Sequence, residues 1–90
     1  MAEPLSSLIN AFGKEHDVVA AIYAGKKTNS WMLYVIATTP MHNPDLEAAV
    51  AAFDTQVHKI RPDVHAMVLP INPKKIPDYA FLEKRMYTRQ

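Results

Sequence analysis

Four histidines are the first side chains to consider for chemistry, because an imidazole can transfer protons near neutral pH or ligate a metal ion. They are His16, His42, His58 and His65. No two of them are four residues apart, and they lack the spacing of a zinc-binding motif. Only His65 lies in an apolar segment that can direct it into a cleft, so it is the candidate for an enzyme site.

Other catalytic patterns are missing from the chain. It has no cysteine, which excludes thiol nucleophiles, thiolate metal sites and disulfides. Its two glycines, Gly13 and Gly25, form no Gly-rich phosphate loop, and there is no Gly-x-Ser-x-Gly nucleophile motif. Glu47 and Asp54 are seven residues apart and resemble a solvated helix face. We therefore predict a protein that is not an enzyme and has no metal site or cofactor; the alternative is an enzyme site around His65.

Two lysine pairs and two aromatic residues define a candidate binding site. It comprises Lys26, Lys27, Trp31, Tyr34, Lys74 and Lys75. If the loops that carry the lysines meet at one end of a sheet, they form a positive patch beside rings on which bases can stack. This pattern predicts a nucleotide or single-stranded nucleic-acid site. The alternative interpretation is solubilising charge and a small aromatic core, because the net charge is only +1.

Length and composition indicate one globular domain over residues 1–90. The 49% hydrophobic and 21% charged contents are those of an ordinary folded protein. A domain of this size buries only about 60–65% of its unfolded surface, so it depends on its core or on a partner. The start of the chain lacks the basic region of a secretory signal, and no apolar run reaches the roughly 18–20 residues of a membrane span. We expect a cytoplasmic protein that does not associate with membranes.

The first half of the chain predicts a helix followed by a hairpin. The apolar residues at helical spacing are Leu5, Leu8, Ile9 and Phe12. Gly13 suits the position just past the end of this helix. The apolar segments 18–24 and 31–37 predict two buried strands, joined by a polar turn over residues 25–30. Such a short turn makes the two strands antiparallel.

The second half predicts a crossover and two further elements. After a loop over residues 38–42, a long helix begins at the N-cap Asn43 and ends at Pro62. Residues 64–71 form a third strand, parallel to the second, and residues 77–87 form a final helix. The predicted fold is therefore an α/β (α+β sandwich) domain of order α-β-β-α-β-α, with a three-stranded mixed sheet covered by helices.

The hairpin and the element order resemble the minimal nucleotidyltransferase domain of the polymerase-beta type, over residues 5–87. In that family a Gly-Ser turn and acids on the following strands hold the triphosphate and two Mg²⁺ ions. Here Gly25 is not followed by serine, and Trp31 and Leu33 lie on the strand where acids are expected. His65 is on the third strand in place of another acid. The resemblance implies a degenerate member that keeps the fold as a binding scaffold without metal-dependent transfer.

Alternation along the hairpin strands predicts a partner. Both faces of each strand are largely apolar, and Trp31 and Tyr34 point to opposite faces. Two amphipathic helices and one shorter helix leave part of these faces for another protein. We predict a small non-catalytic interaction protein that self-associates or serves as an accessory subunit of a macromolecular complex, with the Trp31 and Tyr34 region as the contact. The alternative is a nucleotide or single-stranded nucleic-acid binding module that uses the lysine pairs.

Overall fold

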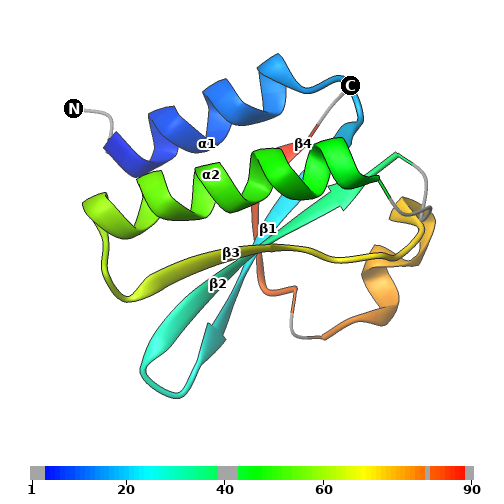
Figure 1. Ribbon diagram of the computed structural model, residues 1–90. Coiled ribbons are helices and arrows are strands. Elements are labelled where there is room, and N and C mark those ends of the chain that lie inside the picture. The colour runs from blue at the N-terminus through cyan, green and yellow to red at the C-terminus, as the bar shows by residue number, and fades with distance from the viewer. Residues whose placement is uncertain (1–3, 39–42, 81, 89–90) are drawn as a thin grey trace.

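A computed structural model of the protein describes residues 4–38, 43–80 and 82–88, so the predicted loop lies outside the described residues except for Thr38. The elements are α1 (Pro4–Glu15), β1 (Val19–Lys27), β2 (Ser30–Ala37), α2 (Pro44–Ile60), β3 (Val64–Val68), the 3₁₀ helix η1 (Pro73–Asp78) and β4 (Lys84–Thr88). Figure 1 shows α1 and α2 side by side over one face of the sheet, with η1 on the other side. The predicted α/β class is confirmed, but the last third of the chain differs from the prediction.

The described residues form a sheet of four strands in the order β3-β2-β1-β4. The β1–β2 hairpin is antiparallel and closes at Lys27 and Ser30, so its turn is shorter than predicted. β3 runs parallel to β2, with Val64 opposite Trp31, which confirms the predicted crossover. α2 carries the chain across one face of the sheet, as a parallel neighbour requires.

The strand β4 lies where a helix was predicted, so the prediction of three strands and a terminal helix is wrong. β4 pairs antiparallel with β1, with Tyr87 opposite Ile22. This pairing satisfies backbone groups on the outer side of β1 that would otherwise lack partners. Just before β4, Glu83 Oε2 accepts a hydrogen bond of 2.7 Å from the Lys26 N–H and extends the contact beyond the strand.

The spacing of Tyr79, Leu82 and Met86 favours a helix in the sequence, but their positions in the fold exclude one. Leu82 is buried against Tyr34 and Ile36, whereas Met86 packs with the core beneath α1 and α2. Leu82 and Met86 therefore lie on opposite faces of the sheet. Residues on one stripe of a helix would lie on the same face of the sheet. An extended segment that passes from one face to the other at the edge of the sheet can place Leu82 and Met86 on opposite faces.

Gly13 lies inside α1, which continues to Glu15, so the prediction that the helix ends before Gly13 is wrong. A Cβ atom built on Gly13 would overlap the Tyr87 ring and lie only 2.6 Å from its Cδ2 atom. Gly13 therefore allows the aromatic ring from β4 to lie directly against the helix.

The segment between β3 and β4 packs on the face of the sheet away from the helices. β3 ends at Val68, earlier than the predicted Ile71, and Pro70 has no N–H with which to continue the ladder. Side chains from this segment surround buried Tyr34 and Ile36; they are Leu69, Ile71, Ile76, Tyr79 and Leu82. The same chain thus packs against both faces of its hairpin.

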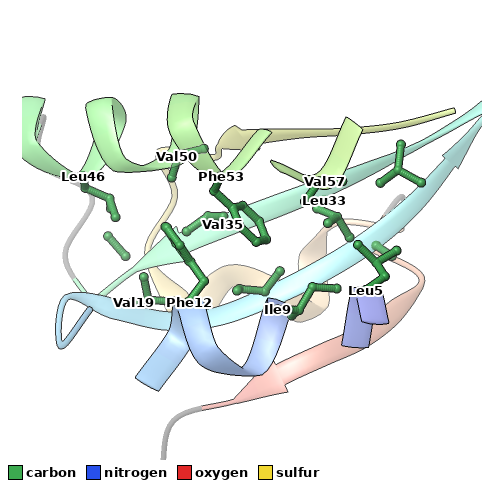
Figure 2. Packing of buried hydrophobic residues seen from close by; sticks show 14 residues of the cluster. Leu5, Ile9, Phe12, Val19, Leu33, Val35, Leu46, Val50, Phe53 and Val57 are labelled. Carbon is green, nitrogen blue, oxygen red and sulfur yellow. The ribbon is translucent and has the colours of Figure 1, made fainter. Parts of the chain in front are cut away.

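The main core lies between the two α-helices and the sheet (Figure 2). The rings of Phe12 and Phe53 stack across the helix pair, with centroids 4.4 Å apart. The predicted N-cap of α2 is confirmed, because Asn43 Oδ1 accepts a 3.1 Å hydrogen bond from the Leu46 N–H. This packing holds α2 against β3 and α1 against β4, and so determines what lies beside each edge of the sheet.

Candidate functional site

The two lysine pairs of the predicted nucleic-acid site lie in different parts of the fold. Lys26 and Lys27 end β1 beside the hairpin turn, whereas Lys74 and Lys75 lie in η1. The chain reaches η1 from the end of β3, which is the opposite end of the sheet, and Figure 1 shows the turn and η1 apart. All four lysines are exposed, but the structure does not bring the two pairs into one patch.

The two aromatic residues of that site take part in packing. Tyr34 is only 7% exposed, within the cluster on the far face of the sheet. Its ring therefore has no open face for stacking with a base. Trp31 is half-buried and packs against the main core.

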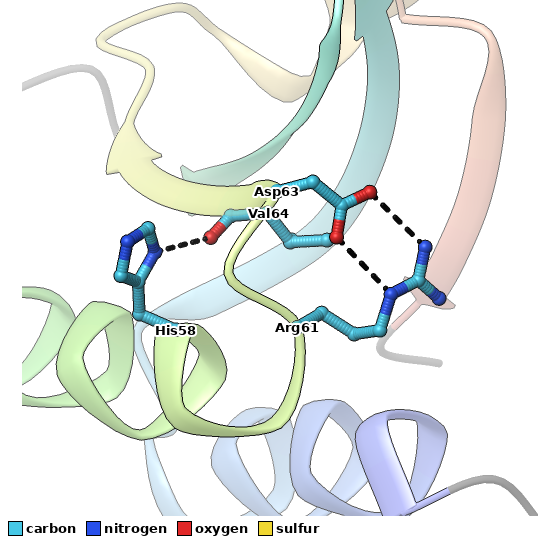
Figure 3. Close-up of polar contacts among 4 residues, drawn as sticks. All are labelled: His58, Arg61, Asp63 and Val64. Carbon is cyan, nitrogen blue, oxygen red and sulfur yellow. Dashed lines mark hydrogen bonds and ion pairs between the residues drawn. The ribbon is translucent and has the colours of Figure 1, made fainter.

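His58 and His65 come together beside β3, with ring centroids 4.6 Å apart and ring planes at 41°. His58 Nδ1 lies 3.1 Å from the Val64 carbonyl oxygen (Figure 3). Because the carbonyl can only accept, Nδ1 carries the proton and donates. Both rings are exposed. Within the part of the chain that the structure describes, no group of three His, Asp or Glu side chains is placed to hold a metal ion.

α2 makes a second hydrogen bond to the outer edge of β3. Asp54, one turn before His58, accepts a 2.7 Å hydrogen bond at Oδ1 from the Ala66 N–H. Asp54 is half-buried, so its interpretation as part of a solvated face is wrong. Side chains of α2 thus occupy the Val64 carbonyl and the Ala66 N–H, which are backbone groups that an edge strand usually leaves open.

The opposite edge of the sheet, β4, is not capped in this way. β4 pairs with β1 on one side and is the last strand of the described sheet. Among residues 4–38, 43–80 and 82–88, no side chain forms a hydrogen bond with its backbone. The α1–β4 groove, of about 380 Å³, lies beside this strand and is lined by Asn10, Lys14, Arg85, Met86, Tyr87 and Thr88. Lys14 and Arg85 are the charged residues among the described residues that line it.

A cavity of about 200 Å³, the core-end cavity, lies where Trp31 and Leu33 meet the ends of α1 and α2. These two positions are where the nucleotidyltransferase resemblance expects metal-binding acids. Here they present apolar surface, and Arg61 and Lys84 line the same cavity. Magnesium takes oxygen ligands, so these four side chains do not provide a magnesium site.

Arg61 follows α2 as its C-cap and is oriented by Asp63. Its Nε and Nη2 atoms donate to the two carboxylate oxygens of Asp63 at 3.2 and 3.1 Å (Figure 3). This hydrogen bonding from Arg61 is the main reason that the pKa of Asp63 lies below its ordinary value of 3.8. Asp63 therefore stays ionised at neutral pH and holds the guanidinium group beside the core-end cavity.

Comparison with known proteins finds no matching family model, no matching curated protein and no matching solved structure. The nucleotidyltransferase resemblance therefore stays a prediction. Among the described residues, no helix is both long enough and apolar enough to cross a bilayer. The candidate sites are thus defined by geometry alone: the α1–β4 groove and the core-end cavity.

Sequence reasoning did not find either site. Lys14 and Arg85 are distant in the sequence and line one groove only because α1 packs against β4. The sequence analysis assigned Arg85 to a helix, so it did not consider the alternation of side chains along a strand at this position. The available signal was the sequence Lys-Arg-Met-Tyr-Thr over residues 84–88, in which β-branched and aromatic residues at the end favour a strand.

Proposed function

We propose that the protein is a small non-catalytic interaction protein that binds an extended, acidic segment of another protein along β4. The partner segment adds a strand to the sheet, with backbone hydrogen bonds for affinity and side-chain contacts for specificity. In this role the protein serves as an accessory subunit. The observation that carries the proposal is the difference between the two edges of the sheet.

At the β3 edge, Asp54 and His58 already use outward-facing backbone groups. At the β4 edge, no described side chain does so. A strand with open N–H and C=O groups is a template for pairing with another chain. β4 is therefore the edge that can offer a partner a row of backbone hydrogen bonds.

The charged residues beside β4 favour an acidic partner. Lys14 and Arg85 line the α1–β4 groove, and Lys84 is next to Arg85 in the strand. A second copy that paired through its own β4 would bring like charges together, which destabilises cross-strand pairing. An acidic segment instead gains attraction during both encounter and binding. These charges favour a different, acidic protein over self-association.

A non-catalytic role is supported by the residues on the strands that resemble a nucleotidyltransferase. Trp31, Leu33 and His65 occupy positions where that family carries acids. The first two line an apolar cavity. The scaffold therefore offers surfaces for binding, and these three positions lack the acids that such chemistry requires.

The proposal is tested with a fluorescein-labelled peptide of about eight residues in which glutamate and valine alternate, a length that matches a strand. Anisotropy should show saturable binding that weakens as salt screens the charges. Lys14→Glu and Arg85→Glu should each weaken binding about tenfold, which corresponds to about 1.4 kcal/mol. Lys59→Glu is the matched control, because it changes the net charge equally at an exposed position of α2 outside the groove.

A peptide in which lysine replaces glutamate should not bind. Equal binding of both peptides, or equal weakening by Lys59→Glu and Arg85→Glu, would overturn the proposal. Binding of a thymidine oligonucleotide in place of the acidic peptide would support the nucleic-acid alternative and also overturn it. A dimeric mass in light scattering that is lost in Arg85→Glu would show that a second copy occupies the edge, against the proposal.

A further inference from the structure

The core-end cavity has the size and lining of a site for a small apolar group. Its volume is about 200 Å³. Among the described residues, the apolar side chains that line it are Leu5, Ala24, Trp31, Leu33, Val64 and Met86. An apolar cavity of about 150 Å³ can stay dry and bind benzene, so this cavity accommodates one ring or a short alkyl chain.

The cavity connects the buried core with the surface. Leu33 and Val64 are each 2% exposed, whereas Trp31 and Met86 are half-buried. An apolar ligand in this space makes dispersion contacts with the lining side chains.

Among the described residues, Lys84 and Arg61 line the same cavity, and the charge of Arg61 is balanced by its ion pair with Asp63. Lys84 lies opposite Ala24 on the paired strands β4 and β1, and both residues face the cavity. Arg61 approaches from the end of α2, oriented by its two hydrogen bonds to Asp63. No carboxylate is among the described residues that line the cavity.

We infer that the core-end cavity is a binding site for a small monocarboxylate with a short aliphatic chain or a single ring. The apolar part lies among Trp31, Leu33 and Val64, where burial removes it from water. The carboxylate lies at Lys84, whose ammonium group supplies charge-assisted hydrogen bonds. A neutral ligand of the same shape loses these bonds, and a cationic ligand is repelled. The inference does not depend on the α1–β4 groove.

Hexanoate is the probe, with hexan-1-ol and hexylamine as neutral and cationic compounds of equal chain length. Trp31 is the only tryptophan, so its fluorescence reports directly on the cavity. Hexanoate should produce a saturable change in this fluorescence and shift the NMR methyl signals of Val64 and Leu33. Hexan-1-ol should bind about tenfold more weakly, and hexylamine should not bind.

Adjacent residues of β4 provide matched variants. Lys84 lines the core-end cavity and Arg85 lines the α1–β4 groove. Lys84→Gln should weaken hexanoate binding about tenfold, with recovery in Lys84→Arg, whereas Arg85→Gln should change it by less than about twofold. Equal affinity for hexanoate and hexan-1-ol, equal effects of the two glutamine variants, or unchanged Trp31 and Val64 signals would overturn the inference. Binding of the acidic peptide should depend on Arg85, whereas binding of hexanoate should depend on Lys84. The two proposals can therefore be refuted independently.

Discussion

Gly13 and Asp54 determine, as single residues, how the helices meet the sheet. Gly13 leaves space for the Tyr87 ring, and Asp54 holds the Ala66 N–H at the edge of β3. Neither role is visible in the sequence, because each depends on a residue that only folding brings near. The cap at Asn43 was predictable because its partner is three residues away in the same helix.

Gly13→Ala tests the close approach of α1 and β4. In an ordinary helix this substitution stabilises the protein by about 1 kcal/mol. Here we expect it to lower the free energy of unfolding by about 1–3 kcal/mol, because the new Cβ atom overlaps the Tyr87 ring. Urea unfolding followed by circular dichroism measures the change.

The control for Gly13→Ala is the same substitution in a Tyr87→Ala background. Without the ring, alanine should regain its normal helical advantage and stabilise the protein relative to Tyr87→Ala alone. If Gly13→Ala stabilised the protein with Tyr87 present, the proposed role of Gly13 would be wrong.

At the scale of the elements, local patterns predicted the first helix, the hairpin, α2 and the parallel β3. Continuous apolar runs and an N-cap are properties of neighbouring residues, so they can be identified in the sequence. The sequence analysis missed β4 because its pairing with β1 joins segments that are far apart in the sequence. The spacing of Leu82 and Met86 in the sequence is that of a helical stripe, but in the structure the two residues lie on different faces of the sheet.

The hydrogen bond from α2 to the edge of β3 leads to a prediction about stability and amide exchange. Asp54→Ala removes the acceptor of the Ala66 N–H and should lower the free energy of unfolding by about 1–2 kcal/mol. The Ala66 amide should also exchange with solvent faster, as measured by NMR hydrogen exchange. Asp54→Asn keeps a side-chain oxygen and should preserve most of the protection. Unchanged exchange at Ala66 in Asp54→Ala would show that this bond does not protect the edge.

At the scale of the whole molecule, the chain covers surfaces that the sequence analysis left for a partner. Tyr34 was expected at a contact, but the segment between β3 and β4 packs over it. The sequence analysis assigned this segment to the end of a strand, a loop and a helix, because its position over the sheet depends on contacts that only folding brings together. With both faces packed and the β3 edge bonded to α2, β4 and the adjacent groove are the surface that we propose binds a partner strand.

Hydrogen exchange of the complex with the acidic glutamate–valine peptide tests this account most directly. Added backbone hydrogen bonds slow amide exchange only where the new strand pairs. We predict that saturating peptide slows exchange of outward-facing amides within residues 84–88 and leaves β3 unchanged. Unchanged exchange in β4 with peptide bound, or new protection along β3, would contradict the account.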